Sequence, residues 1–537
     1  MNIIRTQTVS APAPCPVVID PARLEREFAD YLRDESRLTA QPVERIYLPE
    51  TLADMCDAVR RCAADGVSAT ISGARTGITG GAAPVESKAI ISIEKFRALG
   101  ELKRDDIDGR YYRSVGAGMT LADFQTQRHQ YADGVKPRQL FYPIDPTETS
   151  AQIGGMIACN ASGARTFRYG ATRDWVRAVT VVFANGECAT IRRGEIIASD
   201  SCFLLEASDG QQTTIPLMDI TLPETKSSLG YPLRRDMDAI DLFIGSEGTL
   251  GAIIGAELYL APAPAHRLYL NPYFPSEPDA LRFVKQLRSM AMMRRGKPVN
   301  ETGAALDVLA IEYMNPETME FMRAKREADG ASSHVPPLDE TARASLFVDI
   351  AFDTTDALQA ALPVIESLLA GCNASAKQAW AGTQPADLLE MKQFRHAVPE
   401  SVNNRIAELK RQDPAIIKVG TDMAVPDEHL DDVMALYRDT LTGAGVEFLA
   451  YGHIGDNHLH VAMFPHSKAE LDVQIELYGR MAKRIVAMGG SASAEHGIGR
   501  SKRKYLKIQY DDSILNGLRS VKTALDPNEL FNRGVLF

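Results

Sequence analysis

The sequence predicts an α+β protein built from two large domains. Its 537 residues are more than one hydrophobic core usually serves. Strand-like and helix-like segments alternate along both halves, and the stretch Ala261-Pro262-Ala263-Pro264 breaks the pattern between them. A hydrophobic share of 45% and a charged share of 24% are ordinary values, so we expect a packed globular fold.

The first half is predicted to hold one domain over residues 40–265, preceded by an N-terminal arm and helix over 1–39. Leu52, Met55 and Val59 recur at three- and four-residue spacing, which predicts an amphipathic helix over 51–65 that Gly66 ends. The predicted strands of this half are 67–72, 89–93, 177–183, 188–191 and one that ends at 258–260.

The second half is predicted to hold a domain over 266–519, and residues 520–537 are expected to return to the first domain. The predicted strands are 268–274, 306–313, 344–352, 416–423, 448–453 and 458–464, and the predicted helices include 279–290 and 427–437. This alternation suggests a sheet with helices packed on one face. Gly455-Asp456-Asn457 is expected to form a tight turn between the last two strands.

Charge and composition exclude several classes of protein. A net charge of −11 argues against a nucleic-acid binder, and no apolar run approaches the roughly 20 residues of a membrane helix. Residues 1–21 have no apolar core, so we expect a flexible arm, no signal peptide and a cytoplasmic protein, with peripheral attachment to the inner face of the membrane as an alternative. None of the seven cysteines forms a Cys-x-x-Cys pair, which argues against an iron–sulfur cluster or zinc ribbon.

A glycine-rich loop follows the predicted strand 67–72 and is interpreted as a diphosphate cradle. It contains glycines, which allow close approach of backbone N–H groups to an anion, and hydroxyl side chains that add donors. The candidate residues are Ser72, Gly73, Ala74, Arg75, Thr76, Gly77, Thr79 and Gly80. A surface turn is the alternative. The loop is neither a P-loop nor a Gly-x-Gly-x-x-Gly fingerprint, which disfavours a Rossmann NAD enzyme.

Two further segments carry the same kind of signal. The second comprises 142–146, then 153–163 with Gly154-Gly155, and Tyr169-Gly170; the third is Ile244-Gly245-Ser246-Glu247-Gly248-Thr249-Leu250-Gly251. Three such segments within about 200 residues are hard to explain without a bound nucleotide.

Histidines gather near the C-terminal end. Four of the ten lie between 453 and 496, in Gly452-His453-Ile454-Gly455-Asp456-Asn457-His458-Leu459-His460 and in Ala494-Glu495-His496-Gly497-Ile498-Gly499. His458 and His460 share one face of a strand, and His453 could face His460 across the turn. Two neutral imidazoles and a carboxylate leave open positions on a metal, as in catalytic sites. Hydrogen-bonded core histidines are the alternative.

The glycine-rich segments together resemble the FAD-binding domain of the vanillyl-alcohol oxidase and p-cresol methylhydroxylase superfamily, over residues 40–265. The resemblance implies that the loop Ser72–Thr79 holds the FAD diphosphate and that the other segments line the flavin, with Gly251 and Ile254 near the adenine or the isoalloxazine. The further cofactor residues that it implies are Pro143, Asp145, Thr149, Gly154, Gly155, Asn160, Ser162, Gly163, Glu247, Gly251, Ile254 and Asn532. Residues 71–84 contain no His or Cys for a covalent tether, so we expect a dissociable FAD.

The histidine motifs resemble the C-terminal domain of the FAD-linked D-lactate, D-2-hydroxyglutarate and glycolate dehydrogenases. The resemblance implies a ferredoxin-like substrate (cap) domain, metal ligands at His453, His460 and Glu495, a catalytic His496, and Arg395 as the residue that binds the substrate carboxylate. The chain departs from the family pattern at several positions that would meet a dicarboxylate. These are Asn457-His458 in place of Gly-Asn, Ala462, Pro399, and Lys418, which stands two residues before the family's lysine position. His458 is taken either as a replacement polar contact or as a surface residue.

The resemblance therefore implies a dehydrogenase that oxidises a small D-2-hydroxy acid, with D-lactate as the best candidate and hydride transfer to flavin N5. D-2-hydroxyglutarate or glycolate are alternative substrates, and a transferase like alkylglycerone-phosphate synthase or a flavin protein without turnover are alternative functions. Zinc is the expected metal, with manganese, iron and cobalt open. We expect a quinone or a partner redox protein as electron acceptor, with oxygen as an alternative, and a homodimer is left open. The basic run Arg500–Lys504 is interpreted as a solvated face, with an anion-attracting entrance as the alternative.

Overall fold

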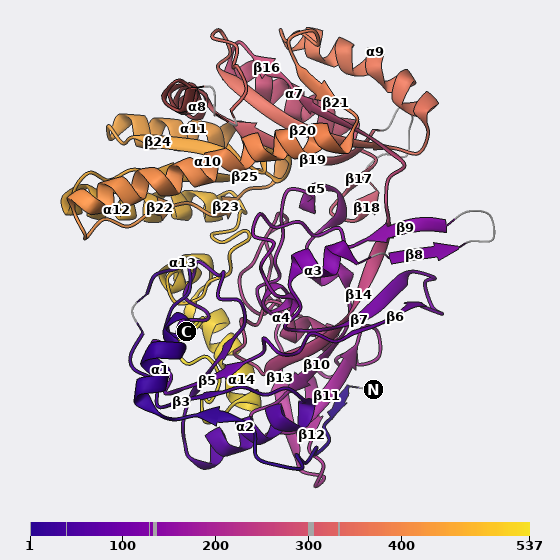
Figure 1. Cartoon of the computed structure of the whole chain (residues 1–537), viewed down its shortest axis with the longest axis vertical. Helices are drawn as coiled ribbons and strands as arrows, with labels where there is room; N and C mark the ends of the chain where they lie inside the picture. Colours follow the sequence, from indigo (N-terminus) through magenta and orange to yellow (C-terminus); the bar gives the residue numbers. More distant parts are fainter. Residues whose placement is uncertain are drawn as a thin grey trace.

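The computed structural model describes residues 2–38, 40–127, 129–132, 137–298, 306–330, 333 and 335–537, and its elements form two stacked parts (Figure 1). One part contains the N-terminal strands and the last helices, and the other contains a nine-stranded sheet. The chain passes between them after β14 (Ala252–Pro262) and before β15 (His266–Asn271), which belong to different sheets. The predicted α+β class is confirmed, whereas the domain boundaries stay a prediction.

A small sheet supports the first glycine-rich loop. Its strand order is β2–β3–β5–β4, and β3, β5 and β4 run parallel. The strands are β2 (Val17–Val18), β3 (Arg45–Tyr47), β4 (Ala69–Ser72) and β5 (Ala89–Ser92). Helix α2 (Leu52–Ala64) packs against β5 and begins with a capping box of Thr51 and Asp54. The loop therefore starts from a fixed point, because β4 ends at Ser72.

An antiparallel sheet forms the centre of the same part, in the order β11–β10–β14–β7–β6, with β8 and β9 beside β14. Its other strands are β6 (Leu99–Arg104), β7 (Tyr111–Gly116), β8 (His129–Ala132), β9 (Pro137–Phe141), β10 (Val176–Val182) and β11 (Cys188–Arg192). The helices of this part are α1 (Pro21–Glu27), η1 (Ala29–Leu32), α3 (Leu121–Thr126), α4 (Ile153–Ala158), α5 (Thr166–Tyr169), η2 (Thr172–Trp175) and α6 (Ile240–Phe243). Helix α4 carries Gly154 and Gly155 and packs against β14 and β7.

The C-terminal helices return to this part. A third sheet contains β1 (Ile3–Arg5), β12 (Cys202–Glu206) and β13 (Gln212–Pro216), and α14 (Asp512–Leu525) lies against β13. Ile498 and Leu506, the latter in α13 (Arg503–Gln509), already join its hydrophobic core, ahead of residue 520. The N–H of Asn532 donates to the carbonyl of Ala69 at 2.9 Å, so the yellow C-terminal segment lies beside the indigo strands (Figure 1).

The nine-stranded sheet carries the histidine motifs. Its path is β21–β15–β20–β19–β24–β25–β22, with β16 beside β20 and β23 beside β25. The further strands are β16 (Tyr273–Phe274), β19 (Asp307–Met314), β20 (Ala344–Phe352), β21 (Trp380–Gly382), β22 (Val419–Gly420), β23 (Met423–Ala424), β24 (Phe448–Gly452) and β25 (His458–Met463), and a separate pair is β17 (Met293–Arg294) with β18 (Lys297–Pro298). The helices are α7 (Glu277–Ser289), α8 (Pro316–Asp329), α9 (Thr355–Gly371), α10 (Pro385–Gln412), η4 (Asp427–His429), α11 (Leu430–Gly443), η5 (Ile454–Asp456) and α12 (Lys468–Ala487).

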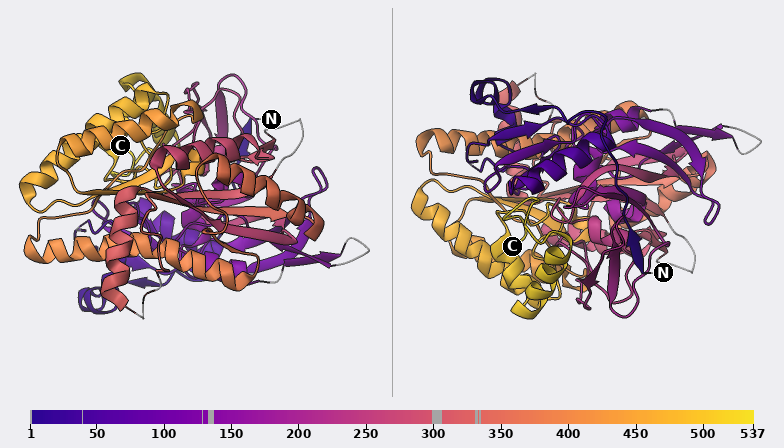
Figure 2. Two further views of the ribbon diagram at one scale, coloured as in Figure 1. Left: turned by 90° about the horizontal axis from the view of Figure 1, so that it is seen from above. Right: turned by 90° about the horizontal axis from the view of Figure 1, so that it is seen from below.

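Helices cover both faces of this sheet, which corrects the expectation of helices on one face. Along β24, Phe448 and Ala450 pack in the core with α7, α9, α11 and α12, whereas Leu449 and Tyr451 pack with α8 and α10. Neighbouring strand residues point to opposite faces, and here both faces are apolar. Figure 2 shows helices on both sides of the strands. Within the described residues, the helices are too short or too polar to cross a membrane.

The predicted strand over 416–423 is wrong over 416–418, which form no strand, and at Thr421 and Asp422, which separate β22 from β23. The hydroxyl of Thr421 accepts the N–H of Val461 at 3.0 Å and donates to the carbonyl of Leu459 at 3.2 Å. At this point a side chain makes hydrogen bonds to β25 that backbone groups make elsewhere in the sheet. The interruption directs Asp422 away from the sheet.

Helix α5 fixes the two parts of the molecule to each other. Phe167 is fully buried in the core of the nine-stranded sheet, although α5 belongs to the other part, and Arg168 forms an ion pair with Asp307. A Cβ atom at Gly455 would lie 2.8 Å from the Phe167 ring. The ring therefore supports the turn between β24 and β25.

We predict that Phe167→Ala lowers the free energy of unfolding by about 3–5 kcal/mol, because it leaves a cavity between the two parts. Urea denaturation followed by far-UV circular dichroism measures this loss. Phe167→Leu is the matched control and should lose much less, since it keeps most of the apolar volume. Equal stability of Phe167→Ala and the parent protein would contradict the role of the ring.

Candidate active site

A cleft lies where the three glycine-rich segments meet the histidine motifs. It also contains His453, His460, Glu495 and His496. The predicted cofactor residues that line it are Gly73, Ala74, Arg75, Thr76, Gly77, Thr79, Gly154, Gly155, Ser162, Glu247, Gly251 and Asn532. Segments more than 400 residues apart in the sequence thus share one cleft, as Thr79 and His496 illustrate.

Two glycines of the cleft are needed because other atoms approach them closely. A Cβ at Gly73 would lie 2.9 Å from Gln152 Oε1, and one at Gly154 would lie 2.7 Å from the Ala117 side chain. The first approach brings the first glycine-rich loop to the start of α4, and the second brings α4 to the residue that follows β7. Gly154 lies in the first turn of α4, and its N–H donates to the carbonyl of Ala117 at 2.8 Å, which holds the helix in place.

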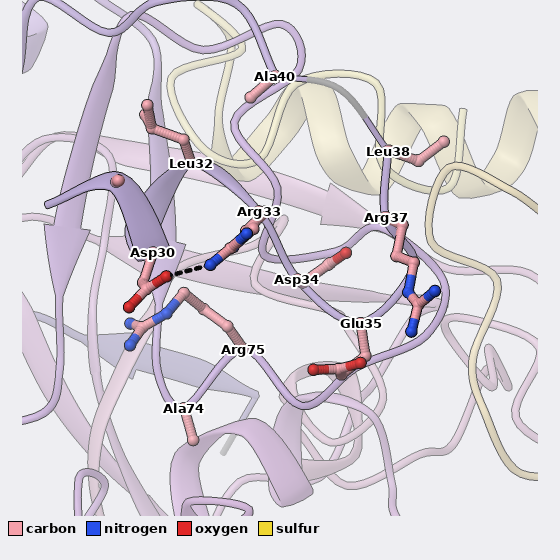
Figure 3. A pocket seen from close by; sticks show the side chains of 11 residues that line it. Asp30, Leu32, Arg33, Asp34, Glu35, Arg37, Leu38, Ala40, Ala74 and Arg75 are labelled. Carbon is pink, nitrogen blue, oxygen red and sulfur yellow. Dashed lines mark hydrogen bonds and ion pairs between the residues drawn. The ribbon is translucent and has the colours of Figure 1, made fainter. Parts of the chain in front are cut away.

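Arg75 binds its own loop rather than presenting a free charge to the cleft. Its Nη1 donates to the Gly73 carbonyl at 2.7 Å and to Glu94 Oε1 at 2.6 Å, and its guanidinium lies 4.1 Å from the Tyr31 ring centre. On its outer side Arg75 lines a second hollow together with Asp30 and Arg33 (Figure 3). Arg75 therefore stiffens the first glycine-rich loop, and its direct contact with FAD stays a prediction.

Other predicted cofactor residues do not line the cleft. They are Ser72, Gly80, Pro143, Asp145, Thr149, Asn160, Gly163 and Ile254. Asn160 has a positive φ of 49° and accepts the N–H of Arg173, so it shapes the chain after α4. Ile254 points into the core that α2 covers, and its neighbour Ile253 lines the cleft instead. Ile253 and Ile254 face opposite sides because side chains alternate along β14.

Four candidate metal ligands converge at one end of the cleft. One ligand atom from each of His453, His458, His460 and Glu495 lies within 4.8 Å of the others. The ring centres of His458 and His460 are 4.7 Å apart, and those of His453 and His460 are 5.4 Å apart. The structure thus brings together the three predicted ligands and adds His458, which is fully buried and is therefore no surface residue.

A carboxylate orients each side of this cluster. The Nδ1–H of His453 donates to Glu312 Oε1 at 2.6 Å, and its Nε2 lies 3.1 Å from Glu495 Oε2. His458 Nε2 lies 2.9 Å from Asp422 Oδ1. A carboxylate behind a histidine fixes the tautomer and aims the other ring nitrogen at the metal. Sequence reasoning missed Glu312 and Asp422, because both come from segments without a recognisable motif.

Burial and charge set opposite protonation preferences within the cluster. Burial and the nearby Lys226 charge lower the pKa of His458 to about 4, and burial with the neighbouring imidazoles lowers the pKa of His460. Although burial opposes it, the Glu312 and Glu495 carboxylates raise the pKa of His453 to about 9. Burial would raise the pKa of Glu495, but Lys226 and His453 hold it well below its usual value.

The donor set fits a divalent metal. His458 Nδ1 is buried and makes no hydrogen bond with any residue in the described part of the chain, and it lies 3.5 Å from Glu495 Oε2. An orphaned imidazole nitrogen beside a carboxylate is a suitable ligand position. Imidazole and carboxylate suit zinc, manganese, iron and cobalt alike.

Two cations hold the carboxylates of the site. Lys226, which is 4% exposed, donates to Glu495 Oε2 at 2.8 Å, and the buried Lys502 forms an ion pair with Asp422. Lys502 belongs to the basic run Arg500–Lys504, and Arg500 pairs with Glu86. The prediction of a solvated face is therefore wrong for these two residues.

Arg395 lies near the cluster but outside the cleft. Its Nη1 donates to Glu312 Oε2 at 3.0 Å, and Glu312 in turn accepts from His453. The Nε of Arg395 is buried and has no hydrogen-bond partner among the described residues. Arg395 is therefore connected to the metal ligands through one carboxylate, and its contact with a substrate stays a prediction.

His496 lies beside the metal ligand His460, and it also lines the cleft. Its ring stacks on His460 with centres 5.3 Å apart, and its Nδ1 lies 3.4 Å from Asp422 Oδ2. With Nδ1 directed at Asp422, Nε2 is the ring nitrogen that remains for a ligand in the cleft.

Comparison with known proteins agrees with this arrangement. The chain matches the "FAD binding domain" family over residues 43–192 and the family "FAD linked oxidases, C-terminal domain" over 297–536. It is 27% identical over 528 residues to D-2-hydroxyglutarate dehydrogenase of Xanthomonas citri pv. viticola, covering 96% of this chain and 93% of that protein. It is 24% identical over 526 residues to D-lactate dehydrogenase of Anaerostipes hadrus, covering 94% and 92%.

A solved structure of alkyldihydroxyacetonephosphate synthase shares the fold, with a TM-score of 0.61 and 16% identity over 96% of this chain and 82% of that chain. The fold and the cleft define an FAD-dependent oxidoreductase with an FAD-binding domain of the vanillyl-alcohol oxidase type. With relatives matching over nearly its full length, the chain belongs to the FAD-linked D-2-hydroxy acid dehydrogenase family.

We predict that metal-stripped protein takes up one divalent ion per chain at the cluster. His460→Ala should weaken this binding by more than the roughly 10- to 100-fold that loss of an outer partner costs, because it removes a ligand. Titration with Co²⁺ followed by its visible spectrum measures the affinity. His466→Ala is the control, since His466 is exposed and pairs with Glu447 away from the cluster. Unchanged affinity in His460→Ala would disprove the site.

Proposed function

We propose that the protein oxidises a small D-2-hydroxy acid to the 2-oxo acid, with D-lactate as the best candidate and with His453, His460 and Glu495 as metal ligands. The observation that carries the proposal is the convergence of these three residues with the buried His458, at the cleft that they, His496 and the glycine-rich segments line. D-2-hydroxyglutarate and glycolate stay as alternative substrates.

In this proposal His496 takes the proton of the substrate hydroxyl at Nε2. The Asp422 carboxylate faces Nδ1 and would stabilise the imidazolium that forms. FAD, when bound, supplies N5 as the acceptor of the substrate's α-hydrogen as hydride. A divalent ion, proposed to be zinc, would lower the pKa of the substrate hydroxyl when bound by His453, His460 and Glu495.

Arg395 is proposed to bind the substrate carboxylate. Its Nε is the buried donor without a partner in the described structure, so an anion could satisfy it without breaking the bond to Glu312. The guanidinium would then join the substrate to the carboxylate that orients His453.

We extend the proposal to a dissociable FAD and to a quinone or a partner redox protein as electron acceptor.

A short acid is favoured over a dicarboxylate by the wall beyond the metal cluster. Ala462 follows His460 on the same face of β25, and it is buried in the apolar core with Phe394 and Val398 of α10. Lys418 is turned to Asn403, to which it donates at 3.1 Å, and does not line the cleft. A second carboxylate placed there would be buried without a cation.

We predict that D-lactate bleaches the flavin under anaerobic conditions at least tenfold faster than D-2-hydroxyglutarate, and that L-lactate does not bleach it. Stopped-flow absorbance at the flavin band measures these rates with and without a chelator. Chelation should abolish bleaching by every substrate. Faster reduction by D-2-hydroxyglutarate would overturn the substrate assignment, and reduction that survives chelation would overturn the metal assignment.

We predict that His496→Gln slows flavin reduction by about 10²–10⁴-fold, the usual contribution of a general base. The variant should keep its flavin and its metal, because His496 is not among the ligands of the four-residue cluster. His429→Gln is the control, since His429 pairs with Asp432 on the surface. Parent-like reduction by His496→Gln would exclude His496 as the base.

A further inference from the structure

Segment 495–499 runs between the metal cluster and the flavin cleft, and two carboxylates bind it from opposite sides. Asp422 accepts the N–H of Glu495 at 3.1 Å through Oδ1 and the N–H of His496 at 3.0 Å through Oδ2. Asp422 lies between β22 and β23 of the nine-stranded sheet. The side of the segment that carries the metal ligand is therefore held by the sheet that carries the histidines.

Glu247 binds the other side of the segment in the same way. Its Oε1 accepts the N–H of Ile498 at 2.8 Å, and its Oε2 accepts the N–H of Gly499 at 2.7 Å. Glu247 is 5% exposed and has a positive φ of 52°, a backbone conformation that a side-chain-bearing residue rarely adopts. It also lines the flavin cleft. Glu247 thus combines a buried carboxylate, whose two oxygens both accept N–H groups of the segment, with an unusual backbone conformation. This combination indicates a specific role.

The diphosphate loop contacts the same segment. The carbonyl of Thr79 accepts the N–H groups of Arg500 at 2.8 Å and Ser501 at 3.2 Å, and the Thr79 hydroxyl donates to the His496 carbonyl at 3.3 Å. A Cβ at Gly499 would lie 2.2 Å from the Thr79 carbonyl oxygen, and one at Gly497 would lie 3.0 Å from Glu247 Oε1. Both glycines also have positive φ. The loops that carry Thr79 and Glu247 therefore pack directly against the segment that carries Glu495 and His496.

We propose that Glu247 is a positioning residue that holds segment 495–499 against the flavin cleft and thereby makes FAD binding and metal binding strengthen each other. The inference rests on the proposed function, because it needs Glu495 as a metal ligand. FAD in the cleft fixes the loops of Thr79 and Glu247, and a metal fixes Glu495. Both ligands then favour one arrangement of the same five residues, which is the physical basis of a reciprocal coupling.

Glu247→Gln tests this coupling, because an amide has one acceptor oxygen where the carboxylate has two. The variant can keep one of the two bonds to the Ile498 and Gly499 N–H groups, and its NH₂ group would face the other. Burial raises the pKa of Glu247 to about 7, so the measurements belong at pH 8, where the carboxylate is mainly ionised.

The experiment measures the FAD dissociation constant of the full-length holoenzyme by flavin fluorescence on dilution, once with Zn²⁺ and once with a chelator. In the parent protein we expect chelation to weaken FAD binding by roughly five- to 150-fold, the usual range of coupling. In Glu247→Gln this ratio should fall toward one. Glu187→Gln is the control, because Glu187 also joins distant segments, through Thr6 and Ser208, yet does not line the cleft. It should keep the parent ratio.

The other possible results separate failure of the coupling from failure of the proposed function. If Glu247→Gln weakens FAD binding equally with and without metal, Glu247 is only a cofactor contact and the inference fails. A parent ratio of one, with metal still bound in a direct Zn²⁺ titration, overturns the coupling but leaves the proposed function standing. A parent protein that binds no metal overturns the proposed function itself. Should Glu247→Gln fail to fold, Gly497→Ala disturbs the same contact from the segment side and should lower the ratio similarly.

Discussion

The burial of the Glu495 carboxylate is the constraint on which the candidate site depends. Its side chain is 12% exposed, and an ionised carboxylate taken out of water is strongly destabilising unless charged or hydrogen-bonding partners surround it. Glu495 Oε2 is approached by Lys226 at 2.8 Å, His453 at 3.1 Å and His458 at 3.5 Å. These partners come from the loop before α6 and from the two ends of the β24–β25 turn. The chain must therefore bring distant segments together before Glu495 can be buried.

The β24–β25 turn, which carries two of these histidines, is held in one conformation by several contacts. Asn457 adopts a left-handed conformation with a φ of 50°, which places His453 and His458 on either side of a single 3₁₀ turn. The buried Arg288 donates to the carbonyl of Ile454 and to Asn457 Oδ1, and Arg295 donates to Asp456 Oδ1 at 2.9 Å. Phe167 packs on the turn from the flavin side. The positions of two histidine rings are thus set by contacts from both parts of the molecule.

Much of this site could be predicted from the sequence, because the informative residues lie close together in glycine-rich motifs. The motifs that contain His453, His460, Glu495 and His496 could be recognised in the sequence, and the family resemblance implies the roles of these residues and of Gly154. Glu312, Asp422 and Lys226 could not, since their contacts are with residues far away in the chain and none of them belongs to a motif. Ile254 stays a prediction as a cofactor residue; its side chain joins the core that α2 covers, and only the register of β14 decides that Ile253 faces the cleft. The helices on the second face of the sheet were not predicted, because a strand that is apolar on both faces shows no alternation of apolar and polar residues.

The same burial has opposite effects on the acids and on the imidazoles, and the site uses both. Glu312, Asp422 and Glu495 are each bonded to a cation, Arg395, Lys502 and Lys226 respectively. Those cations and the histidines keep the pKa values of the three carboxyls low although burial alone would raise them. Burial lowers the pKa values of His458 and His460, and Lys226 beside His458 and the imidazoles beside His460 lower them further, so both rings are neutral at neutral pH. A neutral imidazole and an ionised carboxylate are the forms that bind a divalent metal. The cation pairs therefore keep the carboxylates ionised for binding, whereas His453, whose pKa is raised to about 9, must release a proton when it binds a metal.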